Sequence, residues 1–187
     1  MKKLFLLLLL FVLSSVSVSA QWKVGKMKQD FKYGNEEDGA YFEKGEICAY
    51  TENSNGTITL YQGIAESQIL KAGSFSTSKV KPYIEFTGYY YGKVTDPVDN
   101  YVNVRKGPGT NYPVVGKLKV DSGCFWLFQK TETNWLKVYG DDKSKYGGFF
   151  TTFAGWTCEP EGAVFLGYVY KDRMTNPIQD WTYGVDY

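Results

Sequence analysis

The side chains that could carry catalysis in this chain are cysteines and carboxylates, because its 187 residues include no histidine. A cysteine nucleophile of the peptidase type needs a histidine base, and zinc amidases and endopeptidases bind their metal through histidine. The three cysteines, Cys48, Cys124 and Cys158, also lack the close paired spacing of a structural zinc site. We therefore expect neither thiol nor zinc hydrolysis from this chain alone, and no cofactor or metal.

A glycosidase needs only two carboxylates, so this class of enzyme is compatible with the lack of histidine. The candidate acids are Asp141 with Asp142, Glu159 with Glu161, and the acidic run 36–38. All of them lie in polar stretches, without the apolar surroundings that raise the pKa of a general acid. Solvated loop charges are the favoured interpretation, and we expect no catalytic residue and no enzyme activity.

Residues 1–20 predict an export signal. Lys2 and Lys3 precede an unbroken apolar run, residues 4–13, which is shorter than the ~20 residues of a membrane span. The small residues 18–20 fit cleavage before Gln21, which leaves a mature chain of net charge near zero. We expect an exported protein, periplasmic or extracellular, without a membrane span and without nucleic acid as a partner.

Three cysteines in an exported protein allow at most one internal disulfide. Cys124 with Cys158 is the preferred pair, because Cys124 falls in an expected strand and Cys158 in the long insertion that follows it. Such a bridge would tie the insertion to the strand. Three buried or free thiols are an equally compatible alternative.

The composition predicts an all-β fold. Aromatic residues make up 18% of the chain, with 16 tyrosines and 20 glycines, and no segment has helical periodicity beyond a few turns. Tyrosine suits a half-buried strand, where one end of the ring is apolar and the other wet. Filling a thin β core is the favoured role for these rings, and a binding surface is the alternative.

The clearest element spans residues 101–118. Val102 and Val104 alternate with polar residues in the period-2 pattern of a half-buried strand. The run 107–109, Gly-Pro-Gly, then predicts a chain reversal in which glycine supplies a positive φ and proline a fixed one. An apolar run at 112–115 leads into the next strand.

This segment resembles the signature of the bacterial SH3 (Src-homology-3) family. The matching residues are Asn103, Val104, Arg105, Gly107, Pro108, Val114, Val115, Gly116 and Leu118. Downstream, residues 135–138 resemble the family's W-x-K-V strand, and its closing stretch is matched by Gly167, Tyr168, Val169, Tyr170 and Met174. The resemblance covers about residues 92–174. It implies a C-terminal SH3-like small β-barrel over 89–175, preceded by a smaller β-rich region of unknown fold over 21–88 and followed by a tail over 176–187.

The region before the barrel matches no family. Asn55-Gly56 between the strand-like runs 46–51 and 57–61 predicts a β-hairpin. Residues 65–71 favour one or two helical turns, and residues 73–79 favour a loop or a junction. A degenerate second copy of the barrel is an alternative for this region, but no repeated motif supports it.

An aromatic strand over 83–91 leads towards the barrel, which places the boundary between Glu85 and Lys93. Within the barrel, 124–128 and 135–139 flank a polar run and predict a second hairpin. Residues 140–166 depart from the family as a long insertion rich in aromatic residues. We expect it to add a hairpin, to pack on the N-terminal region or to form one wall of a groove.

The resemblance implies an exported, non-catalytic binding module of the bacterial cell envelope, which recognises peptide or peptidoglycan components in a shallow groove. A structural or interaction subunit that docks on another envelope protein is the alternative. The candidate ligand-binding residues, from the turn and the neighbouring strands, are Tyr101, Arg105, Tyr112, Trp126, Trp135 and Tyr168.

Two kinds of contact are expected from these residues. The planar fork of Arg105 could hold a carboxylate, and the rings could cover peptide or sugar faces. Each residue also has a structural alternative: at least one of the two tryptophans should lie in the core, and Arg105 could hydrogen-bond the following turn. The structural role is favoured for all but Tyr101 and Tyr112.

Overall fold

The computed structural model describes residues 21–34, 40–65, 68–96, 98–120, 125–140, 148–150 and 160–175. Within these ranges the chain is all-β, as predicted, and its helices are limited to the short α1 (Thr77–Val80) and the 3-10 turn η1 (Lys171–Arg173). No helix of this described part is long and apolar enough to cross a membrane. The expected export signal, the tail 176–187 and the predicted Cys124–Cys158 disulfide lie outside it.

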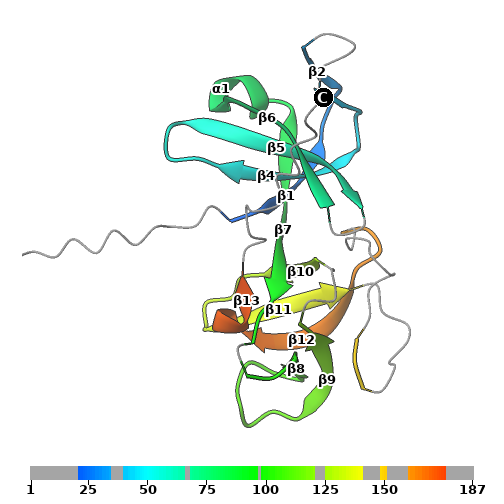
Figure 1. Ribbon diagram of the computed structural model, residues 1–187, viewed down its shortest axis with the longest axis vertical. Helices are drawn as coiled ribbons and strands as arrows, with labels where there is room; N and C mark the ends of the chain where they lie inside the picture. Colours follow the sequence, from blue (N-terminus) through cyan, green and yellow to red (C-terminus); the bar gives the residue numbers. More distant parts are fainter. Residues whose placement is uncertain are drawn as a thin grey trace, which may run out of the picture.

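Antiparallel strands form one long sheet in the order β6-β5-β4-β1-β7-β10-β11-β12-β8-β9, with β13 beside β7 and the hairpin β2-β3 apart (Figure 1). The strands are β1 (Lys23–Met27), β2 (Phe31–Tyr33), β3 (Ala40–Phe42), β4 (Ile47–Glu52), β5 (Thr57–Ala65), β6 (Gln68–Ser76), β7 (Ile84–Val94), β8 (Tyr101–Arg105), β9 (Val114–Lys119), β10 (Trp126–Gln129), β11 (Trp135–Gly140), β12 (Val164–Tyr170) and β13 (Met174–Thr175). The described strands do not close this sheet into a barrel.

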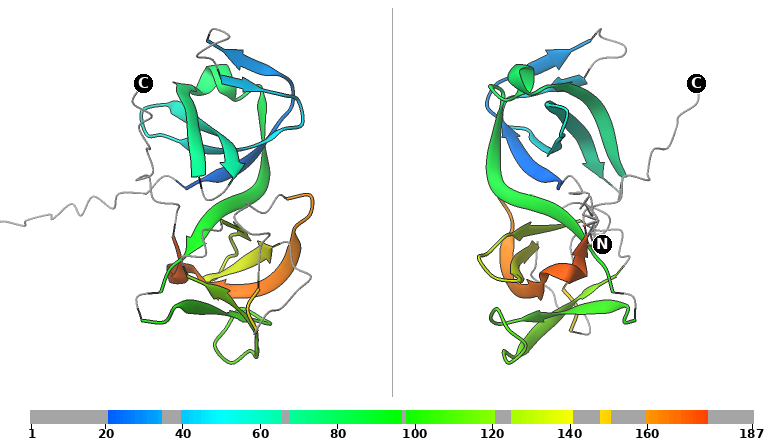
Figure 2. Two further views of the ribbon diagram at one scale, coloured as in Figure 1. Left: turned by 45° about the vertical axis from the view of Figure 1, so that its right-hand side comes forward. Right: turned by 90° about the vertical axis from the view of Figure 1, so that its left-hand side faces the viewer.

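Strand β7 joins two lobes, which lie one above the other in Figure 2. Its residues 84–86 and Tyr90 pair with β1, residues 90–92 pair with β10, and the last two residues pair with β13. We call residues 21–86 the N-terminal lobe and residues 90–175 the C-terminal lobe. The predicted boundary, between 85 and 93, therefore falls inside a continuous strand.

A bulge at Gly88 lets β7 turn from one lobe into the other. The register of β7 against β1 shifts between Phe86 and Tyr90, and Gly88 between them has a φ of 87°. Glycine adopts this φ at little cost, whereas other residues are strained there. The hydroxyl of Thr87 donates a hydrogen bond of 2.8 Å to the carbonyl oxygen of Val24 and fixes the bulge against β1.

The two lobes repeat one chain path. The N-terminal lobe has the strand order β7-β1-β4-β5-β6, and the C-terminal lobe has the order β13-β7-β10-β11-β12. In each lobe a hairpin follows the first strand in the sequence, β2-β3 in one and β8-β9 in the other. In each lobe a single helical turn, α1 or η1, precedes the last strand. Strand β7 thus closes the first copy and opens the second.

The pairing registers of the two copies also correspond. On the face between the lobes, the equivalent rows of paired residues are Val24–Ala49–Tyr61 and Tyr91–Leu127–Tyr139. On the opposite, core face, they are Tyr50–Leu60–Gly73 and Phe128–Val138–Gly167. A repeat is therefore present in the structure, although no repeated motif marks it in the sequence.

Both copies have a register shift between the third and fourth strands of the copy, which are β5 and β6 in the N-terminal lobe and β11 and β12 in the C-terminal lobe. It falls between Leu60 and Tyr61 in one lobe and between Val138 and Tyr139 in the other. The core-face residue on the fourth strand at this step is glycine in both copies, Gly73 with φ 158° and Gly167 with φ 145°. Both glycines have a positive φ, and they mark the same irregularity in the two copies.

Three apolar clusters hold the molecule together. One fills the N-terminal lobe, around Leu60, and one fills the C-terminal lobe, around Val138. The third lies between the lobes and is built from equivalent positions of both copies: Trp22 and Tyr89, Val24 and Tyr91, Ile47 and Phe125, Ala49 and Leu127, Tyr61 and Tyr139. The lobes therefore meet through the same face of each copy, as the subunits of a two-fold symmetric dimer do.

Several local predictions are confirmed. The turn at Asn55-Gly56 joins β4 to β5, and β10 pairs with β11. Val102 and Val104 on β8 are buried in the C-terminal core. The described ends of the insertion pack on both lobes: Phe150 is buried in the C-terminal core, and Glu161 forms an ion pair with Lys26 of β1.

Two predictions in the N-terminal lobe are wrong. Residues 68–71 belong to strand β6 and not to a helix, and residues 73–79 continue that strand and begin α1 instead of forming a loop. Good helix formers such as Leu70 gave the helical prediction. Pairing of β6 with β5, from Thr57 onward, overrides this weak local preference.

Candidate functional site

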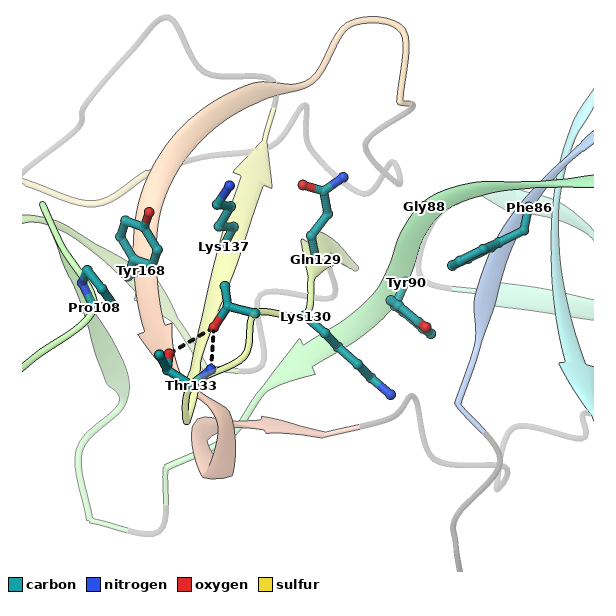
Figure 3. A pocket seen from close by; sticks show the side chains of 10 residues that line it. Phe86, Gly88, Tyr90, Pro108, Gln129, Lys130, Thr133, Lys137 and Tyr168 are labelled. Carbon is teal, nitrogen blue, oxygen red and sulfur yellow. Dashed lines mark hydrogen bonds between the residues drawn. The ribbon is translucent and has the colours of Figure 1, made fainter.

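The candidate site is a groove on the outer face of the C-terminal lobe. Side chains alternate along β10 and β11, so that Phe128 and Val138 enter the core while Gln129 and Lys137 point outward. The N-terminal lobe covers one end of this outer face through the interlobe cluster. The other end remains open as a groove of about 600 Å³ (Figure 3). It is lined by Phe86, Gly88, Tyr90, Pro108, Gln129, Lys130, Thr131, Thr133, Lys137 and Tyr168.

The floor of the groove is a row of neighbours across three strands. Gln129 lies opposite Lys137, and Lys137 lies opposite Tyr168. The hydroxyl of Tyr139 donates a 2.6 Å hydrogen bond to Oε1 of Gln129. This bond does not use the amide NH₂ of Gln129. Burial raises the pKa of Tyr139, and the neighbouring Tyr89 and Tyr168 raise it further, so this hydroxyl keeps its proton and stays a donor.

The turn between β10 and β11 supplies one end of the groove. Thr131 Oγ1 donates to the carbonyl oxygen of Trp135, and the backbone N–H of Thr133 donates to Thr131 Oγ1 at 3.1 Å. These bonds fold the turn back on itself. They hold the Thr131 and Thr133 side chains at the groove, where Figure 3 shows Thr133 below Lys137.

The bulge of β7 forms the wall that the N-terminal lobe contributes. Phe86 is 41% exposed and packs edge-to-face on Tyr90, with ring centroids 5.3 Å apart. Gly88 lies between these two residues in the sequence. A side chain at Gly88 would point at Gln129, because a Cβ there would lie 3.7 Å from its Nε2. The wall therefore depends on the same glycine that turns the strand.

The charge of the groove is positive. Lys130 and Lys137 line it, and no carboxylate is among the described lining residues. Glu132 lies in the adjacent turn but is not one of them. The Nζ of Lys130 lies 4.8 Å from the centroid of the Tyr90 ring. The amide of Gln129, two amines and three rings can bind a polar chain, and the described lining residues include no nucleophile paired with a base.

The structure brings one of the six predicted ligand-binding residues, Tyr168, into this groove. Trp126 is 1% exposed in the core, and its Nε1 has no hydrogen-bond partner in the described chain. Trp135 packs edge-to-face on Tyr170 at 5.6 Å. Their placement matches the structural alternative for the tryptophans, whereas their role towards a ligand stays a prediction.

The other three predicted residues gather around the β8–β9 hairpin. Arg105 Nη1 donates to the carbonyl oxygen of Tyr112 at 2.7 Å, which is the expected structural alternative, a bond to the following turn. The Nζ of Lys117 lies 3.9 Å from the centroid of the Tyr101 ring, and this ring packs edge-to-face with Phe149. None of these three lines the groove.

The glycines of the predicted turn are needed for a different reason than expected. Neither Gly107 nor Gly109 has a positive φ. A Cβ on Gly107 would lie 2.5 Å from the ring of Tyr112, and one on Gly109 would lie 2.6 Å from Oδ1 of Asn111. A larger residue at either position would therefore require the Tyr112 or Asn111 side chain to move, although the φ angles are ordinary.

Sequence reasoning missed most of the groove, including Phe86, Gly88, Gln129 and Lys137. The strand period offered a signal for two of them: with Phe128 and Val138 assigned to the core, Gln129 and Lys137 must face outward. No local pattern places Phe86 beside them, because the bulge of β7 brings it there.

No family model, curated protein or solved structure matches this chain.

Cys48 is buried beside Met27, and burial raises the pKa of its thiol to about 12, so it is inert at neutral pH. The described residues contain no group of three or more acidic or cysteine side chains placed to hold a metal ion.

Proposed function

We propose that this chain is an exported, non-catalytic binding protein of the bacterial cell envelope, which recognises peptide or peptidoglycan components in the groove of its C-terminal lobe. The C-terminal lobe is, in this proposal, an SH3-like barrel of the bacterial SH3 family with a long insertion. The N-terminal lobe is a second, diverged copy of the same fold. The absence of histidine from the sequence supports binding without hydrolysis.

The arrangement of the three motif segments supports the family assignment. The segment that carries Arg105 is β8, the W-x-K-V segment is β11, and the closing segment is β12. Strand β12 pairs with β11 on one side and with β8 on the other, so segments far apart in the sequence are neighbours in the sheet. Gly167 of the closing segment lies so close to β8 that a Cβ there would sit 2.5 Å from the carbonyl oxygen of Arg105.

The groove is the observation that carries the function. It is open, lies on a sheet face, and combines Tyr168 and Phe86 with the polar side chains of Gln129 and Lys137. Concave sites with a few convergent polar groups among aromatic side chains are typical of binding surfaces. It also lies where the two copies meet, so both lobes contribute to it.

Co-sedimentation with purified peptidoglycan sacculi tests this proposal. We expect the protein in the pellet, and we expect Tyr168→Ala to lower the bound fraction. Tyr170→Ala is the matched control, because Tyr170 lies on the same strand but does not line the groove. A protein that stays in the supernatant would count against wall binding. Capture of a stoichiometric envelope protein in that case would favour the docking subunit.

A further inference from the structure

We propose that the groove binds a peptide through its carboxylates, with Lys130 and Lys137 as the cationic contacts. This inference rests on the proposed function and names the ligand chemistry of the same site. Both lysines line the groove, from the end of β10 and from β11. Neither forms an ion pair with a carboxylate of the described residues, so both amines remain available to an anionic ligand.

The other copy shows what the same position looks like when it is neutralised. Lys23 and Tyr90 are equivalent, because they lie opposite Tyr50 and Phe128, and Glu52 is equivalent to Lys130 two residues further on. In the N-terminal lobe, Lys23 forms a 2.6 Å ion pair with Glu52.

In the C-terminal lobe the same pair of positions holds Tyr90 and Lys130. The ammonium group lies over the tyrosine ring instead of against a carboxylate. A ring face attracts a cation but carries no net charge, so the positive charge of Lys130 is not cancelled. The C-terminal copy therefore has a net positive groove where the N-terminal copy has an internal salt bridge.

The arrangement of rings favours a peptide over a glycan. Phe86 and Tyr90 meet at 66°, and Tyr168 meets Phe165 at 82°. Edge-to-face pairs of this kind present no shared flat platform on which successive sugar rings could stack. The amide NH₂ of Gln129 lines the groove together with three of these rings, and such a donor matches the C=O of a peptide backbone.

The test is an anisotropy titration of fluorescein-labelled hexaglutamate with the full chain at low ionic strength, compared with labelled hexaglutamine and with polygalacturonate as an anionic glycan. We expect hexaglutamate to bind and hexaglutamine not to bind. Lys137→Gln and Lys130→Gln should each weaken binding about fivefold, the upper range for an exposed charge pair. Lys119→Gln, on β9 away from the groove, should change it less than about twofold.

Three results would overturn the inference: equal binding of hexaglutamine, an equal loss in the Lys119 variant, or lysine-dependent binding of polygalacturonate without binding of hexaglutamate. The sacculi experiment separates this inference from the function on which it rests. Binding of sacculi that depends on Tyr168, without binding of hexaglutamate, would overturn the carboxylate contacts alone. Hexaglutamate binding that needs both lysines, without any binding of sacculi, would support the contacts and count against the wall ligand.

Discussion

The N-terminal lobe places hydroxyls where the C-terminal lobe places its groove. The equivalent rows are Thr51–Thr59–Ser74 and Gln129–Lys137–Tyr168. In the first row Thr59 bonds to Ser74 at 2.8 Å and receives a bond from Asn53, and Thr51 and Thr59 are 1% and 6% exposed. Short side chains there satisfy one another, whereas the longer ones of the second row extend outward. Equivalent positions of the two copies are therefore buried and hydrogen-bonded in the first row, and open at a groove in the second.

On the face between the lobes the two copies are alike, because both contribute buried apolar side chains to one cluster. The ring centroid of Trp22 lies 4.3 Å from that of Tyr61 and 6.5 Å from that of Phe125, and both pairs are stacked. Trp22 therefore contacts one aromatic residue of its own copy and one of the other copy. Equivalent apolar positions meet and bury one another. This contact covers one end of the outer face of the C-terminal lobe and leaves the other end open as the groove.

Exchanging the central residues of the two rows should have the largest and least symmetrical effect. Thr59→Lys puts an unpaired charge at a buried position and should lower the free energy of unfolding by about 4 kcal/mol. Lys137→Thr, at the equivalent exposed position, should change it by less than about 0.5 kcal/mol. Urea unfolding followed by circular dichroism measures both. Equal effects would show that the rows do not differ in burial as described.

Truncating the interlobe contact comes next. Leu127 is fully buried between the lobes, and Leu127→Ala should cost about 3 kcal/mol, because it leaves a cavity against Ala49 of the other copy. Val114→Ala on β9, where the side chain is largely exposed, is the control and should be nearly neutral. Separate transitions for the two lobes in the Leu127 variant would indicate that this contact couples their unfolding. An unchanged midpoint would contradict the interlobe packing.

The two equivalent glycines should tolerate alanine unequally. Gly167→Ala brings a Cβ within 2.5 Å of a backbone oxygen that cannot move away, at a φ of 145°, and should cost about 2 kcal/mol. Gly73→Ala meets the far end of the Phe75 side chain and lies nearer to extended backbone, so about 1 kcal/mol is expected. Thermal unfolding of both variants ranks them, and the reverse order would contradict the role of close approach in the C-terminal copy.

The smallest effect concerns how the C-terminal copy is closed. Backbone N–H groups of Asp99 and Val98 donate to Asp96, and Arg173 of η1 pairs with it at 2.6 Å; the hydrogen bonds, and then Arg173, lower the pKa of this carboxyl. A lowered pKa stabilises the fold above the pKa of the unfolded state, about 4, and this contribution disappears as the pH falls through the folded value. Asp96→Asn should therefore be less stable than the parent at neutral pH.

The difference between Asp96→Asn and the parent should shrink on acidification. Urea midpoints measured at neutral pH and at about pH 3 test this. A difference that stayed constant across that range would mean that the charge of Asp96 does not contribute.

Features that depend on residues close in the sequence were predicted, whereas features that depend on pairing between distant segments were not. The hairpin at Asn55-Gly56 and the strand at Val102 and Val104 were predicted because turn chemistry and two-residue alternation are local. The helix predicted over 65–71 was wrong, because pairing with β5 outweighs intrinsic preference. The repeat escaped detection, because equivalent positions such as Ala49 and Leu127 share burial but not residue type.

The sequence by itself determined the all-β class, the hairpins, and a chemistry without histidine, because these depend on composition and on neighbours along the chain. Only the tertiary structure decided where the groove lies. Phe86 and Lys137 come together because β7 bulges at Gly88 and passes from one copy into the other. Contacts of this kind depend on how the two lobes of one continuous sheet pack on each other, and no pattern within a single strand encodes that.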